Sequence, residues 1–190
     1  GFYARHSVKV PYVFGDEAGY LLKAAALTGH VTDAYSSYYP AYALLISPLF
    51  LLSKQPLAVF HDVQCLNALL AGIGAVLMYR LARRLAPARS PRQAWLAALV
   101  VSFYPAFMAF TAFALSENLF IPLALGLALA VLDYGHRPGR RAALSLGLLG
   151  GLLALTHPKG MVAAAAAFLA VLPAARQQRR WSDVLLIAAI

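Results

Sequence analysis

Long apolar segments alternate with short polar and basic segments along most of this chain. A helix that spans a membrane needs about 20 mostly apolar residues. The segments that approach this pattern are residues 59–81, 95–112, 119–132, 142–155, 161–172 and 181–190. Pro105 is expected to kink or end the second of them. The pattern predicts an all-α fold, a polytopic transmembrane helical bundle over residues 59–190.

The first 58 residues have a different pattern. Apolar positions recur with a helical period over residues 17–28, and Gly29 is expected to end this helix. Residues 42–52 form a second apolar segment, which is too short to span a membrane. Both segments fit amphipathic helices that lie along the membrane interface. We therefore expect two parts, an outer-face loop with two interfacial helices at 1–58 and the transmembrane bundle at 59–190.

Composition supports a membrane protein. Hydrophobic residues make up 62% of the 190 residues, charged residues 12%, and the mean hydropathy is +0.69. Soluble domains are about 25% charged and about 45–50% apolar. Cys65 is the single cysteine, so no intrachain disulfide is expected. Because the chain starts at Gly1 without Met and stops at Ile190 within an apolar segment, we expect it to be a piece of a larger membrane domain.

The formal net charge of +9 comes largely from arginines in short runs between the apolar segments. The runs are Arg80, Arg83, Arg84, Arg89 and Arg92; Arg137, Arg140 and Arg141; and Arg176, Arg179 and Arg180. Cytoplasmic loops of membrane proteins carry such an excess of basic residues. Alternating spans place all three runs on one face and Asp16, Glu17, Asp33, Asp62 and Glu117 at the other. This predicts a multi-pass protein of the cell membrane, with membrane lipids and no nucleic acid as partners.

Two adjacent carboxylates, Asp16 and Glu17, stand in the stretch GDEAGY before the first apolar segment. Like charges raise each other's pKa, so such a pair usually serves as a base or as metal ligands. The structural alternative is that Asp16 caps the helix that begins near Glu17 and complements its dipole. The two roles are compatible.

Glu117 lies at the edge of a predicted span, where an unpaired carboxylate costs several kcal/mol. It either faces the same cavity as Asp16, as a second acidic group, or caps the span together with Ser116. The sequence leaves both interpretations open.

Four stretches together resemble a known family. They are residues 15–20 (GDEAGY), 39–42 (YPAY), 116–120 (SENLF) and 156–160 (THPKG). In this order, the chain resembles the N-terminal part of a GT-C superfamily glycosyltransferase, of the kind that includes protein O-mannosyltransferases and the lipid A aminoarabinose transferase. The similarity covers nearly the whole chain and lacks only a first span before Gly1.

The resemblance implies a membrane enzyme that moves a sugar from a polyprenyl-phosphate carrier to a lipid, glycan or protein acceptor on the outer face. Inverting transfer needs a base for the acceptor's proton and positive charge on the departing phosphate. By resemblance, Asp16 is the base and Glu17 a supporting acceptor or metal contact. The resemblance leaves open a divalent cation, Mg²⁺ or Mn²⁺, bound by Asp16 and Glu117.

Four basic groups are candidates for contact with the carrier phosphate: Lys159, His157, Arg5 and Lys23. Family members often carry an arginine and an acid where His157 and Lys159 stand, so this chain departs from the commoner pattern. The alternative for Lys159 is a snorkelling side chain after a helix-ending proline. We expect Asp16 and Glu117 to face one cavity, with Lys159, His157 or Arg5 near its rim.

Two other classes remain. A polytopic transporter or lipid flippase places ionisable groups near the bilayer midplane on broken helices, whereas the acidic groups here gather at one boundary. A non-catalytic scaffold has little reason to keep Asp16, Glu17 and Glu117 on one side. The sequence therefore favours the transferase.

Overall fold

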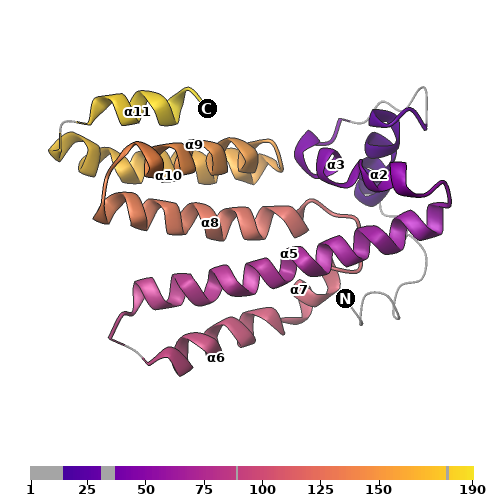
Figure 1. Cartoon of the computed structure of the whole chain (residues 1–190), viewed down its shortest axis with the longest axis horizontal. Coiled ribbons are helices and arrows are strands. Elements are labelled where there is room, and N and C mark those ends of the chain that lie inside the picture. Colours follow the sequence, from indigo (N-terminus) through magenta and orange to yellow (C-terminus); the bar gives the residue numbers. More distant parts are fainter. Residues whose placement is uncertain (1–14, 31–36, 89, 179) are drawn as a thin grey trace. The chain divides into compact units, whose positions relative to one another are not determined.

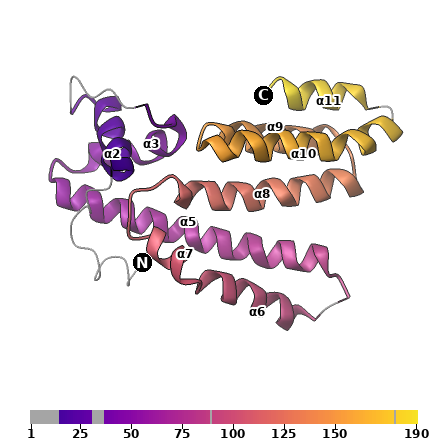
Figure 2. The same ribbon diagram turned by 180° about the vertical axis from the view of Figure 1, so that it is seen from behind.

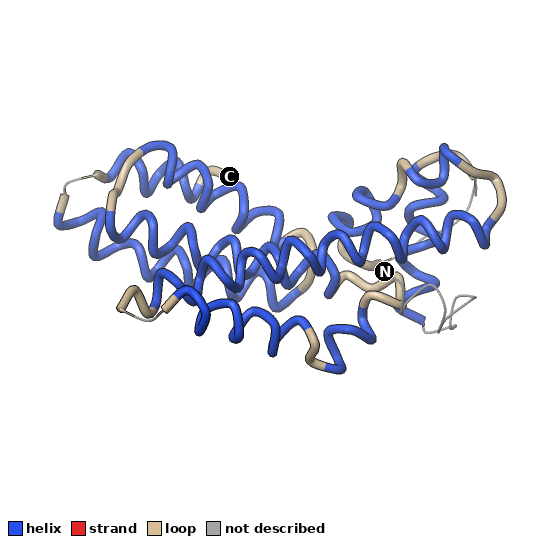
Figure 3. Tube along the Cα trace, turned by 60° about the horizontal axis from the view of Figure 1, so that its bottom comes forward, coloured by secondary structure: helices blue, strands red, loops and turns tan. Residues whose placement is uncertain are grey.

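The computed structural model describes residues 15–30, 37–88, 90–178 and 180–190. These described residues form helices and loops without a strand (Figure 3), so the all-α prediction is confirmed. The helices, all but α4 labelled in Figure 1, are α2 (Gly15–Leu27), α3 (Pro40–Ile46), α4 (Leu49–Leu52), α5 (Pro56–Leu85), α6 (Pro91–Ser102), α7 (Pro105–Phe110), α8 (Glu117–His136), α9 (Arg140–Ala154), α10 (Pro158–Gln177) and α11 (Trp181–Ala188).

Three of these helices are long and apolar enough to cross a membrane. They are α5, α8 and α10, with 30, 20 and 20 residues. They match the predicted segments 59–81, 119–132 and 161–172, and each helix extends beyond its segment at both ends. The protein is therefore a membrane protein with three candidate spans among the described residues.

As expected from Pro105, residues 95–112 do not form a single helix: α6 ends at Ser102 and α7 begins at Pro105. A residue before proline is driven out of the helical region by the proline ring. Tyr104 has φ −61° and ψ 125°, an extended conformation that ends the preceding helix. Residues 142–155 also fall short of a full span, since α9 has 15 residues.

The chain divides into two compact units. The first comprises Gly1–Ala75 and Leu99–Leu119, and the second Val76–Ala98 and Phe120–Ile190. The described part of the first unit holds α2, α3, α4, α7 and the N-terminal part of α5. Its core contains Tyr20, Ala24, Tyr42, Ala43, Ile46, Val63 and Ala114, so the two predicted interfacial segments pack onto the start of α5.

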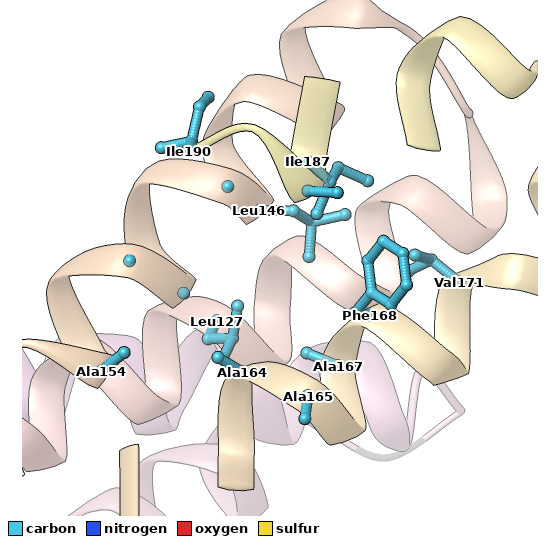
Figure 4. A pocket seen from close by; sticks show the side chains of 14 residues that line it. Leu127, Leu146, Ala154, Ala164, Ala165, Ala167, Phe168, Val171, Ile187 and Ile190 are labelled. Carbon is cyan, nitrogen blue, oxygen red and sulfur yellow. The ribbon is translucent and has the colours of Figure 1, made fainter. Parts of the chain in front are cut away.

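The second unit packs α8, α9, α10 and α11 together (Figure 2). Its core is made of side chains such as Leu127, Tyr134, Leu146, Leu153 and Val171. A cavity of about 350 Å³ opens between these helices, and its lining consists of apolar residues and glycines (Figure 4). It offers no polar side chain that a reaction requires, so it is not a candidate catalytic site.

The arginine-bearing turns α5–α6, α8–α9 and α10–α11, marked by the described residues Arg84, Arg137 and Arg180, lie at one end of the second unit (Figures 1 and 2). Two carboxylates lie at the same end: Asp133 pairs with Arg84 at 2.8 Å and Asp183 with Arg180 at 3.5 Å. The basic end is therefore less positive than its arginines alone imply.

Candidate functional site

Asp16 lies in the first turn of α2 with its side chain exposed. The Tyr38 hydroxyl donates a hydrogen bond of 2.6 Å to its Oδ1 atom. The described helix begins one residue before Asp16, so Asp16 is within the helix rather than in the capping position that the sequence suggested. Its negative charge still complements the helix N-terminus, and one carboxylate oxygen is fixed by a phenol.

Tyr38 is a site residue that the sequence analysis missed. Its ring lies against α2 at Gly19, where an added Cβ would overlap the ring atoms, and Lys23 donates to its main-chain carbonyl. Gly15 and Gly19 are four residues apart and so share one face of the helix. Two glycines on one helical face were the available signal for such a close approach.

A cavity of about 440 Å³ lies beside Asp16. Its lining consists of Gly15, Asp16, Ala106, Ala109, Phe110, Phe113 and Leu115. Asp16 is the one charged residue in this lining, and apart from Gly15 of α2 the rest is hydrocarbon from α7 and the loop that follows it. A single exposed carboxylate at an apolar cavity is an arrangement suited to taking a proton from a bound molecule.

The loop behind this cavity is held by amide side chains. Gln64 of α5 donates to the Ala112 carbonyl at 3.1 Å, and Asn67 donates to the Phe113 carbonyl at 2.9 Å. Asn118 donates to the carbonyls of residues 110, 113 and 115 at 2.9–3.1 Å. Irregular backbone that is shielded from water needs such partners, because its carbonyl groups cannot bind water instead. The polar residues of α5 therefore shape the wall of the cavity.

Glu17 differs from Asp16 in its surroundings. It is fully buried, and its Oε1 atom accepts a 2.9 Å hydrogen bond from the Ala114 main-chain N–H, 97 residues away in the sequence. This bond ties α2 to the loop that lines the cavity. The catalytic role that the resemblance gives Glu17 stays a prediction, whereas the contact supports a structural role.

Replacing Glu17 with alanine should destabilise the first unit by about 1–3 kcal/mol, because the buried Ala114 N–H loses its acceptor. Glu17→Gln keeps an acceptor oxygen and should cost less. Thermal midpoints of the two variants in detergent give the comparison. Equal midpoints for Glu17→Ala and the parent protein would show that the bond does not hold the loop.

Asp16 and Glu117 both act on Tyr20, which is nearly buried in the first unit. Burial raises the pKa of the Tyr20 hydroxyl, hydrogen bonding with Ser116 opposes this, and the charges of Glu117 and Asp16 raise it further. The rings of Tyr38 and Tyr42 lie 5.1 Å and 5.4 Å from that of Tyr20, so a tyrosine cluster occupies this region.

Alkaline pH should weaken this cluster. Burial also raises the pKa of Tyr42, and the hydrogen bond to Asp16 raises that of Tyr38. Since the unfolded chain ionises its tyrosines near pH 10, the stability from these raised pKa values is complete below about pH 10 and is lost as the pH rises through the folded-state pKa. Thermal midpoints measured above about pH 9 should fall less steeply in Tyr20→Phe than in the parent. An identical dependence of the thermal midpoint on pH in the two proteins would show that ionisation of Tyr20 does not destabilise the fold.

The remaining candidates are placed as follows. His157 is the N-cap of α10, and its Nδ1 atom accepts the Lys159 main-chain N–H at 3.1 Å. Pro158 begins this helix, so the alternative that places Lys159 after a helix-ending proline does not hold. A proline in the first turn of a helix lacks only an N–H that would have no helical partner. Lys159 is exposed in that turn, in the second unit, whereas Asp16, Lys23 and Glu117 belong to the first. Arg5 lies outside the described residues.

The described residues contain no group of three or more His, Cys, Asp and Glu side chains able to hold a metal ion. Mg²⁺ often binds through one or two carboxylates together with waters and substrate phosphates. A cation held by Asp16 and Glu117 would therefore need ligands from the donor substrate.

Searches against protein-family models, curated proteins and solved structures found no match to this chain.

Proposed function

We propose that the chain forms part of a membrane glycosyltransferase of the GT-C type, which moves a sugar from a polyprenyl-phosphate carrier to an acceptor hydroxyl. The observation that carries this proposal is the exposed Asp16 carboxylate at the edge of an apolar cavity, with Tyr38 bound to one of its oxygens. One oxygen is oriented by the phenol, and the carboxylate keeps a second oxygen that can accept a proton.

In the proposed reaction, Asp16 takes the proton of the acceptor hydroxyl while the oxygen of that hydroxyl bonds to the anomeric carbon of the sugar. The bond from that carbon to the carrier phosphate breaks, and the phosphate leaves with the electron pair. Charge develops on this phosphate, so a cation beside it favours the transition state. Among the described residues of the first unit, Lys23 is the candidate for this cation. One N–H group of its ammonium donates to the main-chain carbonyl of Tyr38.

The common end of the three arginine-bearing turns supports a multi-pass arrangement in a cell membrane, with this end in the cytoplasm. Transport is supported less well. Gln64 and Asn67, the buried polar side chains of a candidate span, donate to loop carbonyls instead of lining a polar path.

Membrane vesicles from cells that express the protein, supplied with a polyprenyl-phosphate hexose labelled in the sugar, test the proposal. We expect loss of the labelled donor and the appearance of label in a new product. Labelled donor that crosses the vesicle membrane chemically unchanged would instead establish a transporter or flippase.

A further inference from the structure

A groove of about 780 Å³ runs along the C-terminal part of α10 in the second unit. Its lining consists of Leu169, Leu172, Pro173, Arg176, Gln177 and Trp181. The five residues from α10 follow the spacing i, i+3, i+4, i+7 and i+8, so they form one continuous face of the helix. Its apolar residues come first along the helix and its polar residues last.

We propose that this groove binds an anionic phospholipid. Because α10 is a candidate span that ends at Gln177, the apolar residues lie toward the membrane core and Arg176 lies at the interface. An acyl chain fits along Leu169, Leu172 and Pro173, and the phosphate fits beside Arg176. Trp181 is 55% exposed at the start of α11, and tryptophan is enriched at the headgroup level of bilayers.

Charge complementarity identifies the occupant. Arg84 and Arg180, at the same end of the unit, pair with Asp133 and Asp183. Arg176 forms no ion pair with any residue that the structure describes. Interaction with the C-terminal helix dipole accounts for its position in the last turn, yet it leaves guanidinium donors available. A phosphate accepts several such donors at once, and the Gln177 amide supplies another.

The lining holds no acidic residue. A zwitterionic lipid such as phosphatidylcholine brings its own positive group toward Arg176 and has no net charge, whereas an anionic lipid such as phosphatidylglycerol has a net negative charge. One Lys or Arg next to the membrane raises the affinity for anionic lipid about fivefold relative to the affinity for zwitterionic lipid. The groove is therefore expected to select headgroups by net charge.

Trp181 is a built-in reporter for this site. In a Trp95→Phe background it is the only tryptophan of the chain. The protein is placed in vesicles with equal fractions of brominated lipid, either phosphatidylglycerol or phosphatidylcholine, and quenching of the tryptophan emission is measured. We expect brominated phosphatidylglycerol to associate about fivefold more strongly than brominated phosphatidylcholine.

Arg176→Gln should reduce this ratio to nearly one, and Arg176→Lys should keep most of it. Arg137→Gln removes the same charge from the same basic end but outside the groove, so its ratio should match that of the parent. Equal quenching by the two lipids in the parent protein overturns the proposal. So does an equal loss in Arg176→Gln and Arg137→Gln, because it would mean that the surface charge as a whole attracts the lipid.

Discussion

Asp16→Asn should lower the rate of sugar transfer by roughly 10²–10⁴-fold, the usual contribution of a general base. An amide does not accept the acceptor's proton at neutral pH, so the step loses its base. The amide oxygen can still accept the Tyr38 hydroxyl, and the variant should therefore keep its fold. Initial rates with labelled polyprenyl-phosphate hexose, together with helix content from circular dichroism, measure both effects.

Asp62→Asn is the matched control for this experiment. Asp62 lies on α5 in the same unit, is partly exposed, and does not line the cavity beside Asp16. The same chemical change there should leave transfer within about twofold, as expected for a substitution away from the reacting groups. A folded Asp16→Asn protein with nearly full activity would remove the assignment of Asp16 as the base.

The helices were predictable because their signals are local. Residues 59–81 are apolar over the length of a span and residues 119–132 over most of one, and the structure places each within a long helix. Pro105 was expected to interrupt residues 95–112, and it does so through the extended conformation of Tyr104. The N-terminal limit of α10 was missed, because the sequence alone does not tell whether Pro158 ends one helix or begins the next.

The contacts that shape the candidate site were less accessible to prediction. The chemical types of Asp16 and Glu17 are identical, yet one side chain is exposed beside a cavity and the other is fully buried. The difference depends on Ala114, whose N–H binds Glu17 across 97 residues. No local pattern encodes a partner at that distance, whereas the paired glycines beneath Tyr38 did carry a local signal.

Among the glycines of the second unit, Gly160 leaves the least room for an added methyl group, because α9 and α10 are in close contact there. A Cβ built there overlaps the Leu153 carbonyl oxygen and lies 2.5 Å from the Leu153 carbonyl carbon and 3.1 Å from the Ala154 nitrogen. These are backbone atoms of α9 and its end, which unlike a side chain do not rotate away. Small residues allow such close approach between membrane helices.

Gly160→Ala should therefore destabilise the protein by about 2–3 kcal/mol, because α9 and α10 must separate and loosen the packing around Leu153 and Val171. Gly72→Ala, within α5 and with open space around its Cβ, should instead stabilise by about 0.5–1 kcal/mol through the higher helix propensity of alanine. Thermal midpoints in one detergent should move in opposite directions for the two variants. A thermal midpoint for Gly160→Ala at or above that of the parent would mean that α9 and α10 can separate without a loss of stability. The close contact between the two helices would then not stabilise the protein.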